Sequence, residues 1–142
     1  MDALVDVNVL VALLHARHRH SGAAVRWLDG QRAPGLVLVC RIAQMSALRI
    51  LTQPVVMKEE TLSPAEFWRG WDLMMEDDRF LRIEEPKGLE AAWRGVTVAI
   101  RKGQCSETDA YLAAFARAGG WGLVTFDRGF RRFPGLRVEI LI

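Results

Sequence analysis

Short apolar runs alternate with longer segments of helical periodicity along most of this chain. The runs have the length and composition of buried strands, and the segments between them carry apolar residues three or four positions apart. The five strands expected from this pattern are residues 3–5, 36–40, 80–83, 121–125 and 137–141. Strands that alternate with helices form a mostly parallel sheet through right-handed crossovers. The sequence therefore predicts a single α/β/α domain over residues 1–142.

Capping signals predict where several helices begin. Ser63 and Glu66 have the spacing of a capping box, so one helix is expected to start at Pro64 and continue to about residue 76. Asn8 is the expected N-cap of the first helix. A further helix is expected over residues 86–102.

Composition and charge exclude several classes of protein. Hydrophobic residues make up 51% of the chain and charged residues 25%, which is typical of a globular domain and argues against disorder. The formal net charge of +2 excludes a polycationic nucleic-acid coat. Only three of the 19 basic residues are lysine. Arginine suits bidentate contact with phosphate, although a solvated arginine-rich surface explains the same bias.

The apolar runs are too short to span a membrane, and no basic leader precedes them. The two cysteines, Cys40 and Cys105, belong to no spaced metal or redox motif. We therefore expect a soluble cytoplasmic protein in a reducing compartment, with no membrane partner.

Four polar residues stand where an expected strand passes into a helix or turn: Asp6, Gln44, Asp109 and Asp127. Because the carboxyl ends of parallel strands open onto one crevice, these side chains are expected to converge there. Clustered carboxylates repel one another unless a cation neutralises them. Oxygen ligands suit Mg²⁺ or Mn²⁺, and a metal held in this way suits phosphate-ester chemistry.

Each of these residues also has a purely structural interpretation. Asp6 can cap a helix, Asp127 can serve a turn, and Asp109 follows Ser106 at nearly the spacing of a capping box. Gln44 offers a carbonyl oxygen but cannot act as a carboxylate base. Glu107 can replace the missing charge only if the backbone is not yet helical at that point.

Five stretches carry a more specific signal. They are Leu-Val-Asp-Val-Asn-Val-Leu-Val-Ala-Leu from residue 4, His20 with Ala24 and Trp27, Leu-Arg-Ile-Leu-Thr from residue 48, Thr-Asp-Ala-Tyr-Leu-Ala-Ala-Phe-Ala from residue 108, and Val-Thr-Phe-Asp-Arg-Gly-Phe from residue 124. Over nearly the whole length, the chain resembles PIN-domain proteins of the VapC type, the toxin half of bacterial toxin–antitoxin pairs.

The resemblance implies a Mg²⁺-dependent endoribonuclease that is silenced by a cognate antitoxin. It implies Asp6 and Asp127 as metal ligands and Asp109 as a ligand or water-orienting group. The family commonly has glutamate where this chain has Gln44, which is expected to hydrogen-bond the attacking water or the scissile phosphate. An alternative is a catalytically weakened PIN fold that binds RNA or antitoxin without cutting. A receiver-like phospho-acceptor domain lacks support, because the paired acids after the first strand are missing.

Two surfaces are candidates for partners. Arg128, Arg131, Arg132 and Arg137 are expected near the crevice edge, where they can hold an RNA backbone, although a solvated basic turn explains them equally. The helix that starts at Pro64 carries more aromatic and methionine residues than one core-facing stripe needs. Its excess apolar surface is a candidate for contact with the antitoxin or with a second copy in a homodimer.

Overall fold

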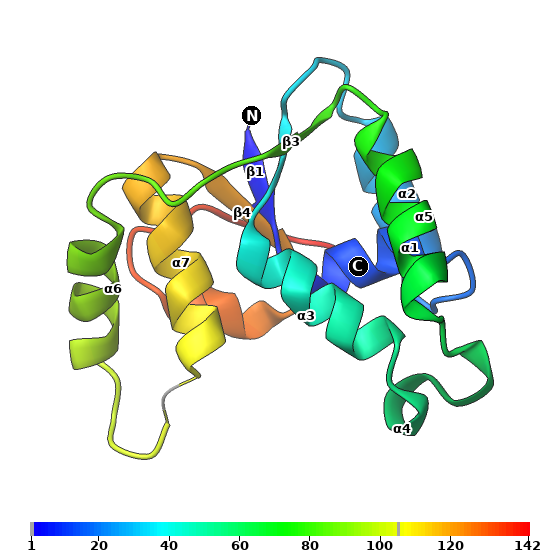
Figure 1. The fold of residues 1–142 in the computed structure, drawn as a ribbon. Helices are drawn as coiled ribbons and strands as arrows, with labels where there is room; N and C mark the ends of the chain where they lie inside the picture. Colours follow the sequence, from blue (N-terminus) through cyan, green and yellow to red (C-terminus); the bar gives the residue numbers. More distant parts are fainter. Residues whose placement is uncertain (1, 105) are drawn as a thin grey trace.

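Five parallel strands form one sheet at the centre of the computed structural model, which describes residues 2–104 and 106–142 (Figure 1). They are β1 (Ala3–Val5), β2 (Val37–Val39), β3 (Phe80–Arg82), β4 (Gly122–Thr125) and β5 (Val138–Ile140). Their order is β3-β2-β1-β4-β5, and every neighbouring pair is parallel. The predicted fold class is therefore confirmed. Four strands are one or two residues shorter than expected.

The chain adds β2 and β3 on one side of β1, and then β4 and β5 on the other. In register, Leu4 of β1 pairs with Leu38 of β2 and with Leu123 of β4. The carboxyl ends of β1 and β4 therefore flank a topological switch point, where open parallel sheets usually bind their ligands. The residues that follow Val5 and Thr125 lie at this point.

The helices form two groups. They are α1 (Val7–Leu14), α2 (Ser21–Asp29), α3 (Arg41–Leu51), α4 (Pro54–Met57), α5 (Pro64–Met75), α6 (Leu89–Val98) and α7 (Glu107–Gly119), with 3-10 turns η1 (Lys58–Glu60) and η2 (Arg128–Arg132). Helix α1 packs with α2, α3 and α5, whereas α6 packs with α7. Figure 1 shows α1 and α5 on one side of the strands and α6 and α7 on the other. No helix in the described part of the chain has the length and apolarity needed to cross a membrane.

Helix α7 is held by a large buried face. Leu112 and Phe115 are at most 1% exposed, and small residues fill the positions between them. The buried alanines of this helix are Ala110, Ala113, Ala114 and Ala116. Small side chains let a helix lie close to the strands that it covers, and burial of this face fixes the position of the first turn of α7.

The capping box at the start of α5 is confirmed. The Ser63 hydroxyl accepts a hydrogen bond from the Glu66 amide at 3.1 Å, and the Glu66 carboxylate accepts one from the Ser63 amide at 2.9 Å. The prediction for the first helix was wrong. Asp6, not Asn8, is its N-cap, because the Asp6 carboxylate accepts from the Val7 amide at 2.7 Å.

The helix expected over residues 86–102 is shorter than predicted and covers Leu89–Val98. Gly88 has a φ of 81°, a left-handed conformation that delays the first helical turn, and Gly103 has the same φ beyond its end. Ser106 precedes α7, as expected, but its side chain makes no capping hydrogen bond. The Asp109 side chain is therefore not engaged in a capping box. Cys105 lies outside the described residues, whereas Cys40 is buried, as predicted for the end of a strand.

Candidate active site

Three carboxylates from separate elements line one pocket of about 380 Å³ at the switch point, named here the acid pocket. Asp6 follows β1, Asp127 follows β4, and Asp109 lies in the first turn of α7. The remaining polar residues of the lining are Asn8, His18, Ser46, Arg49 and Thr108. The structure thus brings together three of the four polar residues singled out in the sequence, which stand up to 121 positions apart in the chain.

Thr125 joins the ends of β1 and β4. Its hydroxyl donates to Oδ2 of Asp6 at 2.6 Å, and its oxygen accepts from the Asp127 amide at 3.0 Å and from Nδ2 of Asn8 at 3.3 Å. A threonine hydroxyl has one donor and two acceptor sites, so these three bonds use its full capacity. The side chain is completely buried. It therefore sets the position of Asp6 relative to Asp127.

Asn8 strengthens the same junction. Its Oδ1 accepts from the Phe126 amide at 3.2 Å, so the amide group binds both Thr125 and the residue after it. From the sequence, Asn8 was expected only to cap a helix. Its contacts with the end of β4 depend on the pairing of β1 with β4, which the sequence around Asn8 does not indicate.

The Asp6 carboxyl is the most perturbed group in the acid pocket. The side chain is 6% exposed, and burial raises its pKa from the ordinary 3.8 to about 6. Hydrogen bonds from Thr125 and Val7 act in the opposite direction, while the negative charges of Asp109 and Asp127 raise the pKa further. A carboxylate that is destabilised by burial and by like charges is one that a bound cation stabilises.

Asp109 and Asp127 are more accessible than Asp6. The Asp109 side chain is 27% exposed, and its Oδ2 lies 3.5 Å from Nη2 of Arg132. This is a weak contact at the limit of hydrogen bonding. Oδ1 of Asp127 accepts from the Gly129 amide at 2.8 Å, so this acid serves a turn as well as facing the acid pocket. Both carboxylates keep oxygen atoms available for a ligand.

Gln44 does not join the three acids in the pocket lining. Its side chain is 4% exposed, and its Oε1 accepts a hydrogen bond from Nη1 of Arg41. From helix α3, the acid pocket is lined by Ser46, Arg49 and Ile50 instead. The Arg41 guanidinium, on the same helix, thus fixes the orientation of the Gln44 amide.

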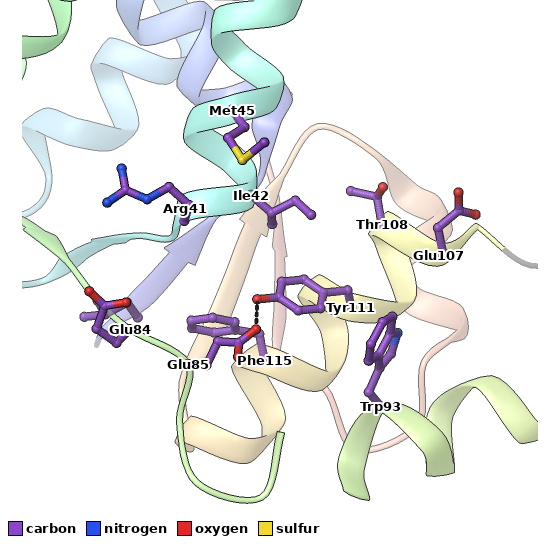
Figure 2. A pocket seen from close by; sticks show the side chains of 11 residues that line it. Arg41, Ile42, Met45, Glu84, Glu85, Trp93, Glu107, Thr108, Tyr111 and Phe115 are labelled. Atoms are coloured by element: carbon purple, nitrogen blue, oxygen red, sulfur yellow. Dashed lines mark hydrogen bonds between the residues drawn. The ribbon is translucent and has the colours of Figure 1, made fainter. Parts of the chain in front are cut away.

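Glu107 also faces elsewhere. The backbone is already helical at this residue, which lies in the first turn of α7. Figure 2 shows it among the side chains around a different pocket, of about 750 Å³, together with Glu85 and Trp93. In this pocket the Tyr111 hydroxyl donates to the Glu85 carboxylate at 2.7 Å. Glu107 therefore does not replace the charge that Gln44 lacks.

His18 was not among the site residues expected from the sequence. It lines the acid pocket, and its Nδ1 accepts from the His20 amide at 3.1 Å. The neutral ring therefore carries its proton on Nε2. Burial, followed by the nearby His20, Arg19 and His15, lowers the pKa of His18. The position of His18 in the sequence does not indicate that it lines the acid pocket, because the loop that carries it reaches the pocket only in the folded chain.

The expectation for Arg137 was wrong. Its Nη2 donates to the carbonyl of Gly120 at 2.7 Å, just before β4 begins. Since β4 and β5 are parallel, Arg137 lies at the amino end of the sheet, opposite the acid pocket. Arg132, by contrast, does reach Asp109.

The residues of the acid pocket fit a hydrated divalent ion better than a fully enclosed one. Within residues 2–104 and 106–142, no three His, Cys, Asp or Glu side chains are close enough together to hold a metal ion by themselves. Mg²⁺ usually keeps several water ligands and takes one or two protein carboxylates. The raised pKa of Asp6 and the three acids around one pocket match that requirement.

Comparison with known proteins agrees with the fold. The model of the PIN domain family matches residues 3–136. The chain belongs to the PIN domain family. It is 39% identical to Ribonuclease VapC41 of Mycobacterium tuberculosis, with 97% of each chain covered, which confirms the resemblance to the VapC type.

Solved structures that share this fold include VapBC2 and a toxin–antitoxin complex. VapBC2 from Rickettsia felis, bound to a DNA fragment from its promoter, superposes with a TM-score of 0.73 at 15% identity, covering 100% of both chains. A toxin–antitoxin complex from Klebsiella pneumoniae gives a TM-score of 0.62 at 19% identity, covering 97% of this chain and 96% of the other. At these identities the similarity shows the fold alone.

Proposed function

We propose that the chain, over residues 1–142, is a Mg²⁺- or Mn²⁺-dependent endoribonuclease and the toxin of a type II toxin–antitoxin system. The observation that carries this proposal is the acid pocket, where Asp6, Asp109 and Asp127 meet at the sheet switch point. The relative named Ribonuclease VapC41, at 39% identity over 97% of the chain, supports the same activity. The reaction is hydrolysis of an RNA phosphodiester bond in the cytoplasm.

Asp6 and Asp127 would hold the metal ion, with Asp109 as a third ligand or as the group that orients the attacking water. When bound, a divalent ion lowers the pKa of a coordinated water and offsets the negative charge that develops on the phosphate. Thr125 fixes the Asp6 carboxylate by donating to its Oδ2. Gln44 hydrogen-bonds Arg41 on its own helix. For Gln44 to orient the attacking water or the scissile phosphate, these two side chains would have to move toward the acid pocket.

The protein itself supplies the remaining steps. Arg49 lines the acid pocket and is exposed, so its guanidinium is suited to binding a phosphate oxygen next to the reacting bond. The His18 ring lines the same pocket and, when neutral, carries its proton on Nε2, which can donate to a phosphate oxygen. Asp109 Oδ1 can accept a proton from the attacking water, because Arg132 approaches only Oδ2 among the described contacts.

The test is RNA cleavage by the purified protein. We expect cutting with Mg²⁺ or Mn²⁺, none with EDTA, and a loss of about a hundredfold or more in the variants Asp6→Asn and Asp127→Asn. Arg26→Gln, an exposed change on α2, serves as the control. Equal cutting by the wild type and Asp6→Asn would point to a contaminating nuclease and refute the assignment.

The antitoxin is proposed to dock along α5. Trp68 is 42% exposed and Leu73 is 63% exposed, although Phe67 and Trp71 of the same helix are buried. Leu73 also borders an apolar groove of about 320 Å³ that is lined by residues of α1 and α2. The solved neighbour that is a toxin–antitoxin complex supports a protein partner of this kind.

A homodimer is proposed to form through α3. Met45 on this helix is 61% exposed and, with Ile42, lines the pocket of about 750 Å³, and contiguous exposed apolar surface marks interfaces. Two variants test both surfaces reciprocally. Leu73→Glu should weaken the antitoxin complex and leave the dimer intact, whereas Met45→Glu should do the reverse in sedimentation and co-purification measurements. If both variants behave as wild type, these surfaces are not the interfaces.

A further inference from the structure

Another pocket carries the opposite charge and is linked to the acid pocket through Arg132, which lines it and contacts Asp109. It has a volume of about 410 Å³ and lies between the end of α6, the last turn of α7 and the segment after η2. Three arginines line it, namely Arg101, Arg117 and Arg132, and we name it the arginine pocket. The other lining residues are uncharged, with Gln104 and Phe133 among them.

The positive charge of this pocket is poorly compensated. Across the described part of the chain, Arg101 and Arg117 form no salt bridge, and the Arg132 bridge to Asp109 is long, at 3.5 Å. Three guanidinium groups in one hollow without a lining carboxylate repel one another modestly and attract an anion. The pocket is therefore complementary to a phosphate group.

Arg132 is already positioned to serve such a ligand. Its Nη1 donates to the Gly129 carbonyl at 2.6 Å, and its guanidinium lies 4.4 Å from the centre of the Phe133 ring. These two contacts hold the side chain between the arginine pocket and Asp109. Less conformational entropy is then lost when a ligand binds.

We propose that the arginine pocket binds a backbone phosphate of the RNA strand next to the phosphate that is cut. This inference rests on the proposed ribonuclease activity and adds a binding site to it. Arg132 lines the arginine pocket and contacts Asp109 of the acid pocket, so this side chain lies where a strand with its scissile phosphate at the acids would pass from one pocket to the other. Phosphate contacts of this kind fix the register of the strand and do not read its sequence.

The charge balance favours RNA over a protein segment at this position. Three carboxylates around the acid pocket repel a polyanion, so productive binding requires nearby cations. The arginine pocket supplies them on the α7 side, and Arg49 supplies one on the α3 side. An acidic peptide is the other anionic ligand that such a pocket can accept, and the experiment separates the two.

The test measures binding without cleavage. Fluorescence anisotropy of a labelled single-stranded RNA is recorded in EDTA over a range of NaCl concentrations, with wild-type protein, Arg117→Gln and Arg101→Gln. Loss of one phosphate contact on a single strand lowers the magnitude of the slope of log K against log salt by about 0.7. We expect that reduction and an affinity loss of about tenfold, similar for RNAs of different sequence.

Arg26→Gln is the matched control, because it removes the same charge from an exposed position on α2, away from α6 and α7 (Figure 1). If Arg117→Gln and Arg101→Gln have the same slope and affinity as Arg26→Gln, the proposal is overturned, while cleavage by the wild type leaves the ribonuclease assignment standing. Unchanged RNA binding with weakened antitoxin binding would also overturn it and assign the pocket to an acidic protein segment. Wild-type protein that neither binds nor cuts RNA would refute the ribonuclease assignment itself.

Discussion

The Thr125 hydroxyl donates to Oδ2 of Asp6 over 2.6 Å, which ties the end of β4 to the end of β1. The two residues are 119 positions apart in the chain. Because Thr125 also accepts from the Asp127 amide, one buried hydroxyl holds two of the three acids in a fixed relation. The separation of Asp6 from Asp127 thus depends on a side chain that is itself not a metal ligand.

Replacement of Thr125 by valine should therefore destabilise the protein and disturb the acid pocket. Valine preserves the shape of the side chain but leaves a carboxylate oxygen of Asp6 and the Asp127 amide without this partner. We expect a loss of about 1–3 kcal/mol in the free energy of unfolding, measured by urea denaturation at pH 7. Thr125→Ser keeps the hydroxyl and is the control. Equal stability of Thr125→Val and the wild type would show that the bond contributes nothing.

The raised pKa of Asp6 predicts an unusual dependence of stability on pH. The folded protein has an Asp6 pKa of about 6, against an ordinary value of 3.8, so between these pH values the native state binds more protons than the unfolded state. The contribution of Asp6 to the free energy of unfolding therefore falls as pH rises from about 4 to about 6, by up to about 3 kcal/mol. Above about pH 7, where Asp6 is ionised in both states, the contribution stays constant.

The variant Asp6→Asn isolates this effect, since other carboxylates titrate in both proteins. In EDTA, its stability relative to the wild type should rise between pH 4 and pH 7, as followed by urea denaturation. Mg²⁺ at pH 7 should stabilise the wild type more than the variant, because the ion offsets the charge that burial disfavours. A stability difference that does not change with pH would contradict the assigned environment of Asp6.

The fold was predictable because its signals are local. Buried strands show as apolar runs, and the Ser63–Glu66 capping box marks the start of α5 within four residues. Where a prediction failed, a distant contact or a special backbone conformation decided the outcome. Gly88, with its left-handed φ, delays α6 in a way that the sequence pattern does not reveal.

The site was only partly predictable for the same reason. Asp6, Asp109 and Asp127 are recognisable because each stands at the expected end of a strand or the start of a helix. Thr125 as the junction, His18 in the lining and Arg101 beside Arg117 depend on how separate elements pack. Sequence spacing carries no information on such contacts until the strand order is known.

The capping box predicts a stability change that is independent of the acid pocket. Ser63→Ala removes the oxygen that accepts from the Glu66 amide. The expected cost is about 1 kcal/mol in the free energy of unfolding, and Ser63→Gly should cost only a few tenths. Thermal or urea denaturation of the two variants gives the comparison. RNA cleavage by the folded protein should not change, and a large loss of activity in Ser63→Ala would mean that α5 influences the acid pocket.

The variant Gln44→Glu separates an active ribonuclease from a weakened binding protein. Oε1 of Gln44 accepts a hydrogen bond from the Arg41 guanidinium. A glutamate carboxylate at position 44 would therefore pair with Arg41 and take the same orientation as the Gln44 amide. Because this pair lies outside the lining of the acid pocket, we expect it to change the activation free energy by about 1 kcal/mol or less, so the cleavage rate with Mg²⁺ should stay within about fivefold of the wild type. The double variant Arg41→Gln with Gln44→Glu removes the guanidinium that would pair with the glutamate at position 44. Its cleavage rate, compared with that of the single variant, tests whether pairing with Arg41 keeps the carboxylate away from catalysis. A rise of about a hundredfold in the single variant, from a wild type close to inactive, would instead show that the glutamine limits catalysis and that the natural protein mainly binds.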